Sequence, residues 1–484
     1  MRPGRGAAAA DAIIVAVPVE LKSLVKPLQA LIARVGELVR SARGGGAVDY
    51  CRIEQQIEEL TAAIERGAHE SVLGALHLDA KRVEIRGEPY VRVGYGVGTY
   101  FTMAGPTELE RPLYRRCGSR NAPVVDAISL RAGVIGNGWL PRTAQAMAHL
   151  HQQGTSREAE QTARQMGRLP YSRASFERVP HEVGSRYLQH RADIEDALSR
   201  ELDIPKEAAS ISVSLDRTTV PMEEPAKRPP GRPRKGAPKR PVTRQFRMAW
   251  CGTVTLHDAE GSALRTIRYG QMPNRDPHEL CNGMANDAFR TREQRPDLKV
   301  ALLADGAHEM WNLLEPHFPG TVFGSVHREI DFWHLAEKLA AAAKVMTPDA
   351  NAAKSLWRRW RKLLRRRKDA AAIILVELDL SGCESIVVDS DRPVHEAITY
   401  LRNHGERMNY AGALKKGLPI ASGNVEATCK TLVGIRMKRC GSRWKAETGD
   451  HVIHLRALAL SDRWDDAMAK LMATQRTAVR SLAA

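Results

Sequence analysis

The stretch ASISVSLDRTTV, residues 209–220, alternates apolar and polar side chains and then reaches Asp216. Alternation with a period of two is typical of a β-strand. Two more strands are predicted downstream, at RQFRMAWCGTVTLHD (244–258) and SALRTIRYG (262–270). We therefore expect Asp216 at the carboxyl end of the first strand of an antiparallel unit.

A second acidic residue follows a strand of another kind. KVALLADGA, residues 299–307, is an almost wholly apolar run that ends at Asp305. Such runs are typical of parallel strands covered on both faces. A helix is predicted before this strand, at 276–293, and another after it, at 308–318. A further strand then precedes a helix that starts at Asp331. The order β-β-β-α-β-α-β-α is that of the RNase H-like fold, expected over residues 208–345.

A third acidic residue, Glu426, stands in LPIASGNVEATCKTL, residues 418–432. Ser422 is a suitable N-cap for a helix there. Beside Glu426 this helix would carry an apolar stripe formed by Val425, Cys429, Leu432 and Ile435. Docked by the stripe against the sheet edge, the helix would direct Glu426 toward Asp216 and Asp305.

Three clustered carboxylates suit one kind of chemistry. Phosphodiester cleavage is well served by two Mg²⁺ ions roughly 4 Å apart, which act on the attacking and the leaving oxygen. Magnesium prefers oxygen ligands and takes few of them from protein, and we expect Mn²⁺ to substitute. The alternative for each residue alone is ordinary: an aspartate after a strand often caps a helix, and a glutamate on a helix is often a solvated ion-pair partner.

These segments resemble DDE transposases of bacterial insertion sequences, most closely the ISKra group. The resemblance is carried by SLDRTTVP (214–221), LLADGAHEMW (302–311), IDFWHLAEKL (330–339) and GNVEATCKTLVGIRMKRCGSRW (423–444), and it extends upstream to TMAGPTELERPLYR (102–115). It implies a catalytic, metal-binding triad of Asp216, Asp305 and Glu426, with a helical insertion before the glutamate. Arg217 departs from the familiar pattern after the first aspartate.

The resemblance also covers a Mutator-like feature, an acid followed three positions later by histidine. In this chain it is Asp331-Phe332-Trp333-His334. The family implies that Asp331 and His334 lie near the active site as accessory residues. The sequence alone equally allows Asp331 to cap its helix while His334 packs beneath it.

The charge of the chain indicates a polyanionic partner. Lys and Arg number 73 against 56 Asp and Glu, which gives a net charge of +17, as in many nucleic-acid-binding proteins. Residues 155–179 are predicted to form a helix, a turn at 167–170 and a second helix capped by Ser172 and kept short by Pro180. This outline is that of a helix-turn-helix, and an ordinary helical hairpin is the alternative. In the first case the residues that face DNA are Arg173 and Arg178.

Two further basic segments are candidates for DNA contact. Between Lys354 and Lys368 nine of fifteen residues are basic, around an apolar stripe. Such a helix either follows phosphates, through residues such as Arg358, Arg359 and Arg361, or is merely solvated. The second segment comes after Glu426 and comprises Lys430, Arg436, Lys438, Arg439, Arg443 and Trp444. There the tryptophan either stacks on an unpaired base or packs into the core.

The Pro-rich basic stretch between the first two core strands, residues 222–244, is expected to be a disordered loop. Its GRP at 231–233 resembles an AT-hook, and a basic linker without sequence preference is the alternative.

The sequence predicts six regions along the chain. They are a helical region at 1–75, a small antiparallel β region at 76–140, a helix-turn-helix-like region at 141–200, the first part of the core at 208–345, an all-helical insertion at 346–415, and a second core part with the Glu426 helix and C-terminal helices at 416–484.

The seven cysteines form no C-x-x-C pair, which favours a reducing cytosol over a disulfide framework. No apolar run approaches the length of a membrane span. We therefore expect a transposase of the bacterial nucleoid that binds double-stranded DNA, both terminal inverted repeats and target, as a homo-oligomer. The alternatives are a metal-dependent, structure-specific nuclease on the same fold and a domesticated DNA-binding regulator.

Overall fold

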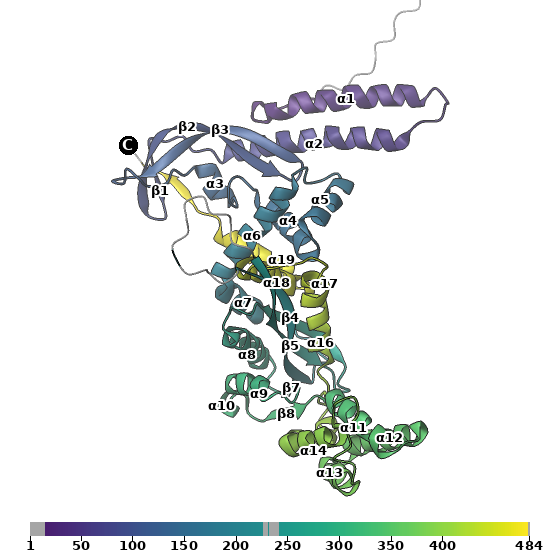
Figure 1. Cartoon of the computed structure of the whole chain (residues 1–484). Coiled ribbons are helices and arrows are strands. Elements are labelled where there is room, and N and C mark those ends of the chain that lie inside the picture. Colours follow the sequence, from purple (N-terminus) through teal and green to yellow (C-terminus); the bar gives the residue numbers. More distant parts are fainter. Residues whose placement is uncertain (1–14, 226–230, 232–241, 483–484) are drawn as a thin grey trace, which may run out of the picture. The chain divides into compact units, whose positions relative to one another are not determined.

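The computed structural model describes residues 15–225, 231 and 242–482, and Figure 1 shows its elements. The chain divides into two compact units. Unit 1 is Met1–Met147, Ser156–Val179 and Met472–Ala484, and unit 2 is Ala148–Thr155 and Pro180–Leu471. Within the described part of the chain, no helix combines the length and apolar character that a membrane span requires.

Unit 1 contains a helical hairpin and a small antiparallel sheet. The hairpin consists of α1 (Lys22–Ala42) and α2 (Tyr50–Ala75). The sheet has the order β3-β2-β1-β9, with bounds β1 Arg82–Ile85, β2 Glu88–Thr102, β3 Gly105–Arg116 and β9 Val479–Ser481. Short helices accompany it, α3 (Ala127–Ala132) and α5 (Ser156–Gln165). The sequence does not foresee β9, because three residues are too few to show a period.

The sheet of unit 2 has five strands in the order β6-β5-β4-β7-β8. Their bounds are β4 Ser210–Pro225, β5 Val242–His257, β6 Ala263–Gln271, β7 Lys299–Ala304 and β8 Val326–Ile330. Strand β5 pairs antiparallel with both β4 and β6, whereas β7 pairs parallel with both β4 and β8. This mixed α/β arrangement is consistent with the expected RNase H-like core.

Alternation along β4 separates the two faces of the sheet. Val213 and Leu215 belong to the main hydrophobic core, on one face. Asp216 and Val220 are four residues apart on the strand, so their side chains point to the same face. Val220 packs there with Cys251, Val425 and Leu432 in a second cluster. The side chain of Asp216 therefore projects from the face that the helix bearing Glu426 covers.

Helices account for most of the remainder of unit 2. Those between the strands are α7 (Arg191–Arg200), α8 (Pro277–Gln294), α9 (His308–Leu314) and α10 (Gly320–Phe323). Those after β8 are α11 (Phe332–Met346), α12 (Ala350–Arg366), α13 (Ala370–Leu380), α14 (Pro393–His404) and α15 (Tyr410–Lys415). The last group is α16 (Gly423–Thr428), a π-helix (Cys429–Gly434), α17 (Ile435–Met437) and α18 (Ala446–Leu460).

The helices α12 to α14 occupy the segment predicted to be an all-helical insertion. Trp360 and Leu364 of α12 and Ile374 of α13 are fully buried in the same hydrophobic cluster as the sheet. These helices therefore share a core with the strands. That the segment is an insertion into an older fold stays a prediction.

Two details of the sequence interpretation are wrong. The loop predicted at 222–244 is shorter, because Met222–Pro225 and Val242–Arg244 pair as the outer ends of β4 and β5. The rest of that loop, with almost all of the AT-hook-like stretch, lies outside the described residues.

Pro180 does not end its helix. The helix α6 begins at Arg173, directly after Ser172, and continues through Pro180 to Gln189. A proline inside a helix costs about 3 kcal/mol. Val183 and Tyr187, beyond the proline, are buried, so their packing offsets the penalty. The chain passes between the units within this helix, within α4 (Pro141–Gln153) and within α19 (Trp464–Thr474).

Candidate functional site

Three aspartates stand in one row across adjacent parallel strands. Ser214 pairs with Leu303, so Asp216 and Asp305, each two residues further on, occupy matching positions on β4 and β7. Ala304 pairs with Ile330 of β8, and the N–H of Asp331 donates to the carbonyl of Ala304 (2.9 Å). Neighbouring strands lie about 4.8 Å apart. The register therefore puts Asp216, Asp305 and Asp331 in one row across β4, β7 and β8, the strands that Figure 1 labels.

The predicted position of Asp216 needs correction. It does not end its strand, because β4 continues to Pro225 and Asp216 pairs with Cys251 of β5. The parallel pairing of β7 ends before this point, since Ser214–Leu303 is its last pair. Asp216 therefore stands just beyond the point where the pairing of β4 with β7 ends.

Arg217 is directed to an ion pair. Its Nη1 lies 2.5 Å from Oε2 of Glu309, and its guanidinium lies 5.8 Å from the ring centre of Trp250. Successive side chains of a strand point to opposite faces. Arg217, the residue that departs from the family pattern, therefore forms an ion pair on the opposite face of the strand and does not place its cation beside Asp216.

The carboxylate of Asp305 is held at the start of α9. Its Oδ1 accepts from the N–H of Ala307 (2.9 Å), and its carbonyl accepts from Nε1 of Trp311 (2.8 Å). Tyr400 of α14 lies close by. Burial, followed by the charges of Asp305 and Asp331, raises the pKa of Tyr400 well above its usual value. This phenol therefore stays protonated beside two carboxylates, and the sequence gives no signal of it.

Asp331 is fully buried and makes the capping contacts that the sequence allowed. Its Oδ1 accepts from the N–H groups of Trp333 and His334 at the start of α11 (2.7 and 2.9 Å). Its Oδ2 accepts from the N–H and the hydroxyl of Ser422, the residue before α16. The capping alternative for this residue is confirmed, and the same carboxylate also holds the start of the helix that carries Glu426. That Asp331 lies near an active site stays a prediction.

Glu426 lies beside the Asp331–His334 pair. One ligand atom from each of Asp331, His334 and Glu426 falls within 4.8 Å of the others. His334 Nδ1 is 3.5 Å from Asp331 Oδ1. The hydroxyl of Ser422 does not cap α16 as predicted, because it donates to Asp331.

A thiol joins this helix to the first aspartate. Cys429, three residues after Glu426, donates through Sγ to Oδ2 of Asp216 (3.5 Å). Cys429 is buried and opens the π-helix. The turn after Glu426 therefore contacts Asp216. Among the described residues, the acidic and histidine side chains whose ligand atoms lie within 4.8 Å of one another here are Asp331, His334 and Glu426, without Asp216 and Asp305, so the convergence of the predicted three carboxylates stays a prediction.

The predicted apolar stripe is realised only in part. Val425, Cys429 and Leu432 are buried, whereas Ile435 is 60% exposed. The reason is the π-helix, which holds one extra residue in its turn and shifts the phase of the residues after it. Arg436 and Met437 are buried in place of Ile435.

The predicted DNA-contacting residues differ in how far they are free to reach a ligand. Exposed members are Arg173, Arg178, Arg358, Lys430, Lys438 and Arg443. Of these, Arg173 bonds Ser156 Oγ (3.3 Å) and Lys438 bonds Thr218 Oγ1 (2.7 Å). Arg359 is exposed as well and pairs with Glu377. The remaining members are engaged within the protein: Arg361 lies over Trp333 and Trp357, Arg436 is buried against the carbonyl of His151, Arg439 is half-buried, and Trp444 is half-buried with Nε1 bonded to Met437. Burial of Arg436 argues against its contact with DNA.

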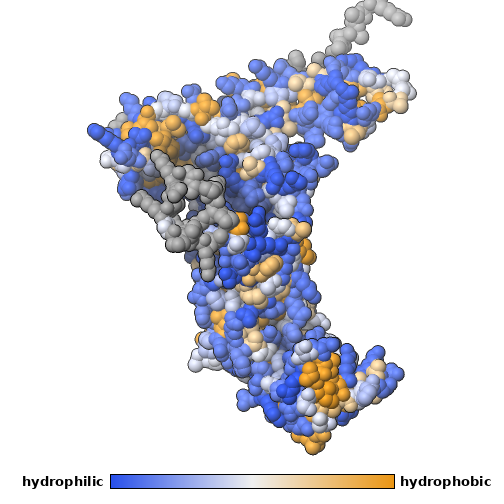
Figure 2. Space-filling model, viewed as in Figure 1, coloured by the Kyte–Doolittle hydropathy of each residue, from blue (hydrophilic) through white to orange (hydrophobic). Residues whose placement is uncertain are grey.

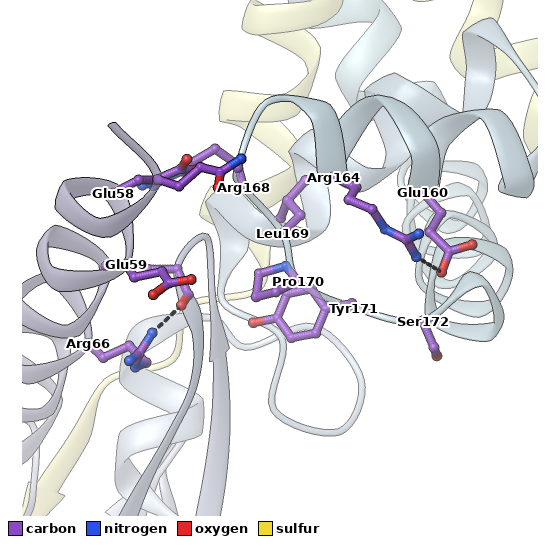
Figure 3. Close-up of a pocket in the computed structure, with 14 residues that line it drawn as sticks. Glu58, Glu59, Arg66, Glu160, Arg164, Arg168, Leu169, Pro170, Tyr171 and Ser172 are labelled. Carbon is purple, nitrogen blue, oxygen red and sulfur yellow. Dashed lines mark hydrogen bonds and ion pairs between the residues drawn. The ribbon is translucent and has the colours of Figure 1, made fainter. Parts of the chain in front are cut away.

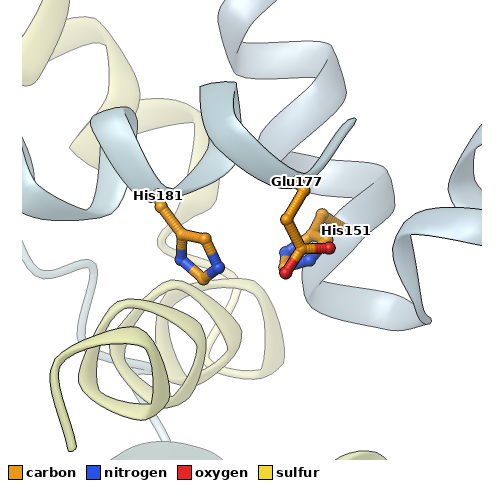
Figure 4. Close-up of side chains that lie close together, drawn as sticks. All are labelled: His151, Glu177 and His181. Atoms are coloured by element: carbon orange, nitrogen blue, oxygen red, sulfur yellow. The ribbon is translucent and has the colours of Figure 1, made fainter. Parts of the chain in front are cut away.

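Unit 2 also contains a group of histidines that the sequence did not single out. The rings of His151 and His181, drawn in Figure 4, lie 5.3 Å apart between centres. The ring of His181 lies 5.4 Å from that of His451, with their Nδ1 atoms 3.4 Å apart. Burial, followed by the charge of His181, lowers the pKa of His451 to about 4.

This lowered pKa predicts acid sensitivity. An unfolded histidine titrates near pH 6.5, so between pH 6.5 and 4 the unfolded chain binds a proton that folded His451 does not. Stability should be full above pH 6.5 and fall as the pH drops, by about 3 kcal/mol from this group. Urea unfolding of the full chain at several pH values should show a smaller decline in His451→Asn than in the control His395→Asn, which changes a half-buried histidine paired with Glu384. Equal declines in the two variants would contradict the prediction.

A polar cavity of about 700 Å³ lies in unit 1, beside the turn of the predicted helix-turn-helix. Figure 3 shows Glu58, Glu59 and Arg66 of α2 on one side and Arg164 of α5 on the other. Arg66 donates to the carbonyl of Ala104 (2.7 Å), and Arg164 pairs with Glu160. The charges of this cavity are thus largely matched within the unit, and it carries no clustered acids like those of the sheet edge.

Comparison with known proteins gives little beyond this geometry. No family model matches the chain, and no curated protein matches it. Among solved structures it is similar to a crystal structure of the Mos1 mariner paired end complex with Mn, at 16% identity over 55% of this chain and 78% of that chain, with a TM-score of 0.15. At that TM-score the two chains do not superpose as wholes, so the functional conclusion rests on the strand order and the side-chain contacts of this chain.

Proposed function

We propose that this chain is a DDE-type DNA transposase of the ISKra group, which cuts DNA at the ends of an insertion sequence and joins them to target DNA. One observation supports this most. Asp216 and Asp305 occupy matching positions on adjacent strands, and Glu426 stands on a helix whose next turn contacts Asp216. The resemblance of the surrounding segments to that family supplies the strand-transfer step.

The donor set suits divalent cations. Asp216, Asp305 and Glu426 offer only carboxylate oxygens, which Mg²⁺ and Mn²⁺ accept as ligands. When bound, such ions activate the attacking oxygen and stabilise the leaving oxygen of a phosphodiester. Asp331 would fix the helix that presents Glu426 through its bonds to Ser422, and His334 lies beside Asp331 and Glu426.

The chain's own residues would prepare this site in three ways. The Cys429 thiol orients Asp216, and the Ala307 N–H orients Asp305. The charges of Asp305 and Asp331 help raise the pKa of Tyr400, so this buried phenol stays protonated near them. Exposed cations that follow Glu426 in the chain, such as Lys430 and Arg443, would hold the phosphates of double-stranded DNA.

The proposed function is tested with DNA that flanks the coding frame. The full chain should nick or cut such a duplex with Mg²⁺ or Mn²⁺ and do nothing in EDTA. It should also join the freed 3′ ends to a second duplex. Cutting without joining would favour a structure-specific nuclease on the same fold, and binding without cutting would favour a DNA-binding regulator.

Asp331 should act as a positioning residue in this reaction. Asp331→Asn weakens the bonds that hold Ser422, so Glu426 loses its fixed position and cleavage should fall about 10- to 100-fold, as for residues that orient metal ligands. A matched control is Asp349→Asn, which alters the cap of α12, where Oδ2 accepts from the Ala352 N–H (2.6 Å). Cleavage rates on one duplex at saturating Mg²⁺ measure both, and a loss of equal size in the control would assign the effect to helix capping in general.

A further inference from the structure

The helices α1 and α2 form an antiparallel hairpin whose seam is incompletely covered. Along each helix, mainly apolar residues recur at alternating steps of four and three. In α1 these positions are Leu24, Leu28, Leu31, Val35 and Leu38, and in α2 they are Ile53, Ile57, Leu60, Ile64 and Gly67. This is the spacing of a coiled-coil seam. Ser23 Oγ donates to the Gly67 carbonyl (2.8 Å), which fixes the antiparallel register. Even so, α1 contains no buried residue.

A second apolar stripe runs beside the first along α1. Val25, Ile32 and Val39 follow each other at intervals of seven, directly after seam positions. Ile32 is 70% exposed and Val39 is 45% exposed. A two-helix seam needs only the first stripe, whereas a helix in a bundle carries the wider one because it packs on two neighbours. In the described residues the main contacts of α1 are with α2 and the short turn Val19–Leu21, and Ile32 and Val39 of the second stripe stay exposed.

The charges of the two helices indicate what that neighbour is. The first helix, α1, carries four basic side chains and one acidic one, whereas α2 carries two basic and five acidic ones. A surface of α1 is therefore complementary to a surface of α2, and a second copy of the hairpin offers just such a surface. In Figure 2, viewed as in Figure 1, hydrophobic residues lie at the surface of this hairpin among hydrophilic ones.

We propose that the α1–α2 hairpin is a self-association surface, in which two copies of the chain form a four-helix bundle with the stripe Val25–Ile32–Val39 of one copy packed against α2 of the other. In this arrangement each helix has two neighbours of opposite charge, as in antiparallel bundles. The surface lies entirely within unit 1. It is independent of the proposed DNA chemistry, so the failure of either proposal leaves the other intact.

The test is the oligomeric state of the full chain without DNA. Sedimentation equilibrium or light scattering over a concentration series should show a dimer for the unaltered protein. Ile32→Glu with Val39→Glu should weaken the dimer at least roughly 100-fold, because two apolar contacts are lost and two charges face acidic α2. Ala30→Glu with Ala33→Glu places the same charges on the outer, exposed side of α1 and should leave the dimer unchanged.

A milder pair of substitutions tests whether a loss of dimer comes from a folding defect. Ile32→Ala with Val39→Ala keeps good helix formers and should weaken the dimer by roughly 10-fold, with unchanged helical circular dichroism. A monomer for the unaltered chain at every concentration would overturn the proposal, as would a dimer that the stripe and control variants alter equally. A monomeric stripe variant that has lost its helical signal counts against it too, since these side chains are exposed in the single chain.

Discussion

Asp305→Asn is expected to abolish Mg²⁺-dependent DNA cleavage, and Asp216→Asn and Glu426→Gln are expected to do the same. Each change removes one anionic oxygen ligand while keeping the size of the side chain. Metal ions contribute several kcal/mol to transition-state stabilisation, and about 1.4 kcal/mol corresponds to a factor of ten. Losing one ligand should therefore slow cleavage by roughly 10³-fold or more. Single-turnover cleavage of a duplex from the element end, measured in Mg²⁺ and in Mn²⁺, gives this factor.

Two controls separate chemistry from structure. DNA binding in EDTA should be preserved in all three variants, because the exposed cations remain in place. Asp276→Asn changes a carboxylate that also follows a strand and precedes a helix, where its side chain accepts from the His278 N–H at the start of α8. It should cleave at the rate of the unaltered chain. Full activity in any of the three acid variants would remove that residue from the proposed ligand set.

The second large effect concerns stability and lies away from this site. Asp287 of α8 is 2% exposed and accepts two bonds from the guanidinium of Arg463, at 2.9 and 2.7 Å. It also accepts from the hydroxyls of Tyr269 and Ser199. Arg463 is itself 5% exposed, so Asp287→Ala leaves a buried, unpaired charge. Such a loss costs about 3–5 kcal/mol in the free energy of unfolding.

Urea unfolding of the full chain, followed by circular dichroism, measures this cost. Glu293→Ala lies on the same helix and breaks an exposed ion pair with Arg290, so it should cost less than about 1 kcal/mol. The double change Asp287→Leu with Arg463→Met removes both charges and should recover most of the lost stability. A cost for Asp287→Ala as small as that for Glu293→Ala would show that Arg463 finds water or another partner.

The sequence-based interpretation succeeds where local periodicity is strong. The alternation at 209–220 and the apolar run at 299–307 each form a strand in the expected place, and the strand order agrees with the expected mixed sheet. Errors arise where tertiary packing overrides a local signal. Pro180 sits inside a helix because buried neighbours beyond it offset its cost, and the strands β4 and β5 extend because each supplies the other's hydrogen-bond partners.

The π-helix after α16 shows the same limit at the candidate site. A regular helix would bury Ile435 with Val425 and Leu432, and the sequence gives no sign of the extra residue in the turn at Cys429–Gly434. The structure exposes Ile435 and buries Arg436 instead. A residue that seemed suited to hold DNA is thereby committed to the carbonyl of His151.

The order of residues along the chain was enough to indicate a mixed sheet and a basic protein, because periodicity and charge are local properties. The resemblance of the quoted segments singled out the acidic positions Asp216, Asp305 and Glu426. Only the folded chain decided that Asp331 completes the row of aspartates, that Tyr400 faces it, and that the Cys429 thiol reaches Asp216. Those contacts join residues dozens to hundreds of positions apart. Strand register and helix phase determine them, and both depend on the simultaneous packing of the whole unit.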